Sequence, residues 1–141
     1  MRFMMLMIPK GYGSAEPGTM PSAVDVEAMM RYNESLKRAG VLLSLDGLHP
    51  PSMGARVVFD SGRPRVLDGP FAEAKEVLGG YWMVQVRSRE EAIEWAKRCP
   101  VTGNDTIEIR QVQEFEDFPQ EVTDVLKGFT EMQPQYPDAR H

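Results

Sequence analysis

The 141-residue chain has few of the side chains on which metal and covalent chemistry depend. It holds one cysteine, Cys99, and two histidines, His49 and His141. A single cysteine excludes a disulfide within the chain and is typical of a reducing compartment. Two histidines and one cysteine, widely separated, also give no zinc-binding spacing. We therefore expect no metal, no cofactor and a cytoplasmic location.

An excess of positive charge is also absent. The chain has 16 Lys and Arg against 21 Asp and Glu, for a net charge of -5. A general nucleic-acid binder needs a basic surface, so we expect no nucleic-acid partner. The opening apolar run, residues 3–8, stops at Pro9. It is too short for a signal-peptide core and far below the roughly 20 apolar residues of a membrane helix, so we expect no membrane partner.

Hydrophobic periodicity predicts a mixture of strands and helices. The expected strands are residues 3–8, 41–46, 55–60, 65–68, 80–87 and 106–115, with a hairpin turn at 61–64. One helix is expected over residues 22–39, where Met29, Tyr32, Leu36 and Ala39 form an apolar stripe before Gly40. A second helix is expected to begin at Ser88, because Glu91 completes a capping box.

This order of elements predicts one α+β domain over residues 1–115. It matches a ferredoxin-like split βαβ with an additional hairpin strand and both helices on one face of an antiparallel sheet. The other face would show apolar side chains to water, which predicts a homodimer. Residues 116–141 form a C-terminal extension, in which Val122, Val125, Leu126 and Phe129 have helical spacing. Residues 133–141 are expected to fray.

The most unusual stretch is residues 68–81, here named the signature segment. It begins Asp-Gly-Pro-Phe-Ala-Glu-Ala-Lys-Glu and ends in Gly79, Gly80 and Tyr81. Asp-Gly-Pro is a turn sequence in which Gly69 permits a positive φ, and the paired glycines allow close backbone approach to a ligand or a neighbour. Composition alone favours a solvated loop held by salt bridges.

The signature segment resembles that of DGPF proteins in the YciI-related (YCII) family. The resemblance extends to residues 39–43, 47–51 and 88–100 and covers about residues 2–115. It implies a bacterial, dimeric ferredoxin-like α/β barrel with a cleft near the signature segment. It also implies a His–Asp pair, in which Asp68 matches the aspartate of the motif. Because residues 22–39 contain no histidine, His49 is the candidate partner.

These residues support three hypotheses about function. In the first, Asp68 and His49 form a general base that acts on a small carbonyl or enolic substrate. The candidate ligand-binding residues are Phe71, Glu73, Lys75, Glu76 and Tyr81. In the second, which rests on the resemblance, the chain is a non-catalytic module linked to an extracytoplasmic-function sigma factor. In the third, the signature segment only stabilises the dimer, and His49 is a surface histidine before a Pro-Pro turn.

Overall fold

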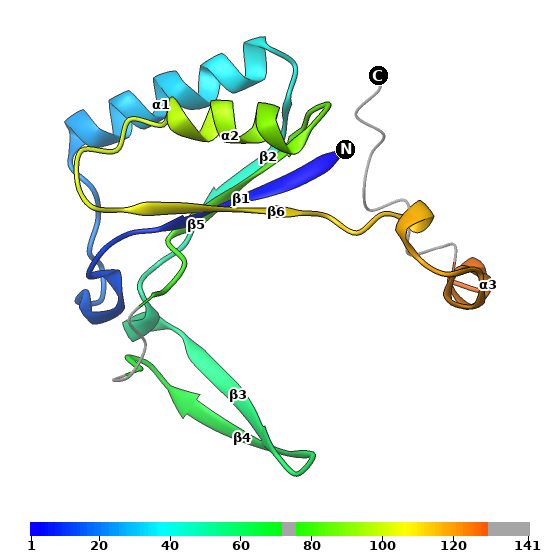
Figure 1. The fold of residues 1–141 in the computed structure, drawn as a ribbon. Coiled ribbons are helices and arrows are strands. Elements are labelled where there is room, and N and C mark those ends of the chain that lie inside the picture. Colours follow the sequence, from blue (N-terminus) through cyan, green and yellow to red (C-terminus); the bar gives the residue numbers. More distant parts are fainter. Residues whose placement is uncertain (72–75, 130–141) are drawn as a thin grey trace.

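A four-stranded antiparallel sheet forms the centre of the chain. Figure 1 shows the computed structural model, which describes residues 1–71 and 76–129. The strands are β1 (Arg2–Ile8), β2 (Leu42–Gly47), β5 (Gly80–Gln85) and β6 (Thr106–Gln111), in the order β2-β5-β1-β6. The helices α1 (Ala23–Arg38) and α2 (Arg89–Lys97) lie on one side of this sheet (Figure 1). Each helix joins two strands separated by a third, which is compatible with the predicted ferredoxin-like fold.

The hairpin is a separate unit that projects from the main sheet. The strands β3 (Ala55–Asp60) and β4 (Arg63–Asp68) form their own two-stranded sheet (Figure 1). The additional hairpin predicted from the sequence is therefore present, as a unit separate from the main sheet. The expected four-residue turn is wrong, because the turn contains only Ser61 and Gly62, with φ values of 49° and 82°. Positive φ at both residues is typical of a two-residue hairpin. Pro64 is tolerated inside β4 because both strands are edge strands.

The core lies between the sheet and the two helices. Alternate residues of β1 and β5 point into it, and Met5 and Val84 are fully buried. Tyr32 and Leu36 cover them from α1, and the Tyr32 ring meets the Trp82 ring edge-on with centroids 5.7 Å apart. Burial alternates along β5, with Trp82 and Val84 buried and Tyr81 and Met83 only partly so.

Side-chain caps begin both helices where the sequence predicts. The hydroxyl of Ser22 accepts a hydrogen bond from Asp25 N at 3.2 Å, and that of Ser88 accepts one from Glu91 N at 3.1 Å. The Glu91 carboxylate returns to the backbone N–H of Arg87 at 2.9 Å, one residue before the expected position. The two caps satisfy N–H groups that have no partner inside the helices.

The sheet face turned away from the helices, here named the outer face, carries an apolar strip. Because side chains alternate along a strand, Met4 and Leu6 of β1 point away from the core, as do Tyr81 and Met83 of β5. Met4 pairs in register with Met83, and Leu6 with Tyr81. Among the described elements, no helix lies over this face (Figure 1).

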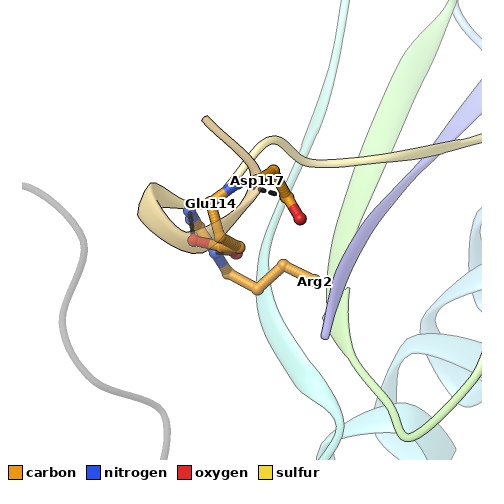
Figure 2. Close-up of polar contacts among 3 residues, drawn as sticks. All are labelled: Arg2, Glu114 and Asp117. Carbon is orange, nitrogen blue, oxygen red and sulfur yellow. Dashed lines mark hydrogen bonds and ion pairs between the residues drawn. The ribbon is translucent and has the colours of Figure 1, made fainter. Parts of the chain in front are cut away.

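A charged clamp fixes the start of the C-terminal extension to the first strand. Figure 2 shows Arg2 beside Glu114, with its guanidinium nitrogens at 2.6 Å and 3.0 Å from the two carboxylate oxygens. Glu114 N donates to the Asp117 carboxylate at 2.8 Å, and this capping box begins the 3₁₀ turn η3 (Phe115–Asp117). The expected last strand is therefore too long, since β6 ends at Gln111.

The clamp is followed by the short helix α3 (Gln120–Lys127), where the sequence predicts one. Val125 on this helix and Phe129 just after it are each 63% exposed, whereas Leu126 is half-buried. The predicted fraying of residues 133–141 lies outside the described residues, and the division at residue 115 stays a prediction. None of the helices in the described ranges combines the length and apolar character needed to cross a bilayer.

The clamp can be tested by removing one charge. Glu114→Gln should lower the free energy of unfolding by about 1–2 kcal/mol, because two charge-assisted hydrogen bonds to a largely buried guanidinium are weakened. Glu34→Gln is the matched control, since the Glu34–Arg38 pair is exposed and should cost less than about 0.5 kcal/mol. Urea unfolding measures both variants, and equal losses would contradict a structural role for the clamp.

Candidate functional site

The signature segment connects the hairpin to the central sheet, and backbone hydrogen bonds hold both of its ends. At its start, Gly69 N donates to Gly54 O at 2.9 Å. Near its end, Gly79 N donates to Met7 O at 2.8 Å, and Gly79 O accepts from Leu48 N at 2.9 Å. The segment is therefore tied to the 48–54 turn and to β1.

Three glycines of this segment sit where no side chain fits. A Cβ on Gly69 would lie 1.7 Å from the carbonyl oxygen of Pro51. A Cβ on Gly79 would lie 2.5 Å from the Pro9 ring, and one on Gly80 would lie 2.8 Å from Asp46 O. The expected close approach at Gly79 and Gly80 is confirmed, and it is made to neighbouring chain segments. The positive φ that Gly69 permits is not used, since Gly69 is not among the residues with positive φ. Glycine is required at this position because a side chain would overlap the backbone of Pro51.

The segment lines a cavity of about 380 Å³, here named the signature cavity. The 49–56 turn, which includes the 3₁₀ turn η2 (Pro51–Met53), forms one wall, and Phe71 with residues 76–78 forms the other. Three predicted ligand or catalytic residues, His49, Phe71 and Glu76, therefore gather around one hollow. Its volume lies within the usual range for small-molecule sites, roughly 300–1,000 Å³.

Arg56 supplies a positive charge to this cavity. Its guanidinium carbon lies 4.0 Å from the centre of the Phe71 ring, in a cation–π contact. His49 adds an imidazole, which can donate and accept hydrogen bonds through its two ring nitrogens. An arginine fork and an imidazole beside apolar walls can bind a small carboxylate or enolate and move one of its protons. Arg56 is not among the site residues predicted from the sequence.

Asp68 lies beside this cavity without lining it. It is exposed and ends β4, where its register partner is the cavity residue Ala55. No hydrogen bond or ion pair joins Asp68 to His49, both of which the structure describes. The predicted His–Asp pair therefore stays a prediction. The predicted ligand residues Glu73 and Lys75 lie outside the described residues.

A second cavity of about 250 Å³, here named the inner cavity, lies between α1 and the sheet. Tyr81 borders it, although the Tyr81 side chain points to the outer face. The Tyr81 hydroxyl donates to Asp46 Oδ2 at 2.7 Å, and this hydrogen bond raises the pKa of Tyr81. Asn33 and Trp82 also line the inner cavity. The sequence signal for Asn33 was available, because Asn33 is a polar residue four positions after Met29 on the buried stripe of the helix.

The single cysteine has a packing role. Cys99 is half-buried just after α2, with its sulfur 4.0 Å from the sulfur of Met29. Burial raises the pKa of the Cys99 thiol to about 11, so the reactive thiolate is scarce at neutral pH. Among the described residues, no group of three or more His, Cys, Asp or Glu side chains is arranged to hold a metal ion.

Comparison with known proteins gives two matches. The family model of the YCII-related domain matches residues 1–116, which span the sheet, both covering helices and the signature segment. An uncharacterised protein of Rhizobium meliloti (strain 1021) is 35% identical over 86 residues, covering 55% of this chain and 69% of that protein.

The close approach at Gly69 gives a direct test of how the site is held. Gly69→Ala should lower the free energy of unfolding by about 2 kcal/mol or more, because its methyl group would overlap a backbone oxygen. The matched control is Gly103→Ala, where the nearest atom lies 4.0 Å away and the change should stay within about 0.5 kcal/mol. Thermal and urea unfolding measure both, and a Gly69→Ala protein as stable as the control would contradict the close packing.

Proposed function

This chain belongs to the YCII-related domain family, and from that premise we propose that it is a homodimeric small-molecule-binding domain. We assign to its signature cavity acid–base chemistry on a small carbonyl or enolic substrate. The observation that carries the proposal is the grouping of His49, Phe71 and Glu76 with Arg56 around one hollow. A cation, a proton acceptor and an apolar wall together match the parts of such a substrate.

The proposed chemistry is a proton transfer next to a carbonyl group. Arg56 binds the carboxylate or carbonyl oxygen of the substrate, and its contact with Phe71 orients the guanidinium. The imidazole of His49 takes a proton from the adjacent carbon, and the electron pair moves onto oxygen as an enolate. The imidazolium then returns the proton. In this scheme Asp68 positions His49, Glu76 orients a polar group of the substrate, and Tyr81 belongs to the inner cavity.

The dimer follows from the outer face of the sheet. Met4, Leu6 and Met83 are half-buried and form a contiguous apolar strip across β1 and β5, and the part of it that remains in contact with water is costly. A second copy of the same sheet would cover it in a twofold arrangement, giving a dimeric α/β barrel. The helix α3 lies beyond the end of β6 (Figure 1), and its exposed residue Val125 would add to the same interface.

One observation favours the alternative of an interaction module. The apolar side of α3 contacts little of the described chain, and acidic residues such as Glu121 and Asp124 lie beside it. An amphipathic, acidic helix of this kind could bind a basic surface on a sigma factor of the extracytoplasmic-function type. In that case the outer face and α3 would be free of a second copy.

The binding proposal predicts that acetoacetate, a small anionic ketone, binds the signature cavity. Arg56→Ala should weaken its binding about 10- to 100-fold, because a charged hydrogen bond is lost. Arg63→Ala is the matched control, since it removes the same charge at the start of β4, outside the cavity. Isothermal titration calorimetry measures all three proteins. An undetectable affinity of the wild type, or equal losses in both variants, would contradict the proposal.

The proposed proton transfer is tested with acetoacetate as the substrate. Exchange of the C2 protons of acetoacetate with deuterium oxide should be faster with the wild type than in buffer, and His49→Gln should remove the acceleration. Binding with exchange at the buffer rate would contradict the acid–base role and leave only the binding domain.

The dimer predicts a specific loss on charging the outer face. Sedimentation equilibrium should find a dimer for the wild type and a monomer for Met83→Lys, because a buried lysine without a partner is strongly unfavourable. Val24→Lys, at a position on α1 that is 77% exposed, should remain dimeric. A monomeric wild type would contradict the dimer and favour the sigma-factor alternative, which requires those surfaces to be free.

A further inference from the structure

The inner cavity has room for a small molecule. It is a partly open hollow of about 250 Å³. An apolar cavity of about 150 Å³ is already large enough to bind a small apolar molecule. Met29 of α1, Met7 of β1 and Leu45 of β2 are among its walls, so most of its surface is apolar. The chemistry proposed for the signature cavity does not use this space.

One buried amide lines the inner cavity. Asn33 is only 8% exposed, and its Oδ1 accepts a hydrogen bond from the indole N–H of Trp82 at 2.7 Å. Because an indole nitrogen only donates, the amide oxygen must face Trp82 and the amide nitrogen is turned away from it. The hydrogen-bond partner that the structure shows for this nitrogen is the sulfur of Met30 at 3.7 Å. A thioether is a weak acceptor, and the nitrogen has two protons to donate.

The charge of the lining decides which ligand the cavity can hold. Asp46 and Tyr81 border the cavity, but they pair in register and their side chains lie on the outer face, where the Tyr81 hydroxyl donates a hydrogen bond to the Asp46 carboxylate. No charged side chain of the lining therefore points into the cavity, and an anion buried there without a partner would be strongly unfavourable. Buried donors in proteins are normally matched by a good acceptor, which a ligand oxygen would provide here.

From these contacts we propose that the inner cavity is a second binding site, for a small, uncharged and largely apolar molecule that carries a carbonyl oxygen. The oxygen accepts a hydrogen bond from Asn33 Nδ2, and the apolar part of the molecule lies against Met29 and Trp82. The unbranched side chains of Met7 and Met29 adapt to its outline. This site is independent of the proposed function, because the signature cavity offers Arg56 to an anion and shares none of these residues.

Three probes of similar size test the proposal. Acetophenone has the carbonyl group, ethylbenzene lacks it, and benzoate carries a negative charge. In a ¹H–¹⁵N spectrum, acetophenone should shift the indole N–H resonance of Trp82. Ethylbenzene should bind about three- to tenfold more weakly, which is the loss expected for one neutral hydrogen bond. Benzoate should bind more weakly than either.

Two variants distinguish the contribution of the Asn33 hydrogen bond to ligand binding from that of the cavity volume. Asn33→Ala should bring the affinity for acetophenone down to that for ethylbenzene. Met29→Trp should remove the binding of both, because the larger ring fills the cavity while the hydrogen bond between Asn33 and Trp82 is kept. Val66→Trp, on the exposed hairpin, is the matched control and should bind as the wild type does.

Saturating acetoacetate should not displace acetophenone, which keeps this test distinct from that of the signature cavity. The proposal is overturned if acetophenone leaves the Trp82 resonance unchanged at millimolar concentration. It is also overturned if Met29→Trp binds acetophenone like the wild type, or if ethylbenzene binds as tightly as acetophenone.

Discussion

The backbone of the signature segment passes its neighbours so closely that only glycine fits at three positions. Gly69 lies against the carbonyl of Pro51, Gly79 against the Pro9 ring, and Gly80 against the backbone of β2. These contacts fix where the chain leaves the hairpin and where it enters β5. Since residues 76–78 wall one cavity and residues 79–82 wall the other, both cavities depend on the same path of the backbone.

The two cavities differ in charge although they share one chain segment. The signature cavity has Arg56 and His49 on its lining, so it suits an anion and a proton transfer. The inner cavity has apolar walls and the buried amide of Asn33, which is why we propose an uncharged acceptor for it. The Gly79 backbone, which bonds to both Met7 and Leu48, lies between them.

Periodicity and capping predicted most of the fold, whereas the sites depended on contacts between distant segments. The strands and helices were predictable because their apolar spacing is regular. The length of the hairpin turn was not, because proline is common in turns whereas Pro64 lies inside β4. His49 and Phe71 could be selected from the motif and its resemblance. Arg56 could not be selected in this way, because Arg56 and Phe71 are distant in the sequence and their contact forms only in the folded hairpin. Asn33 carried a signal that was overlooked, a polar side chain on an apolar stripe.

The most direct test of the account maps where an anionic carbonyl compound binds. In a ¹H–¹⁵N titration with acetoacetate, the largest shifts are predicted for the backbone amides of residues 48–56 and 76–78. Shifts that cluster instead on the solvent side of α1 or α2, with residues 48–56 and 76–78 unchanged, would contradict the claim that the signature segment walls a binding site.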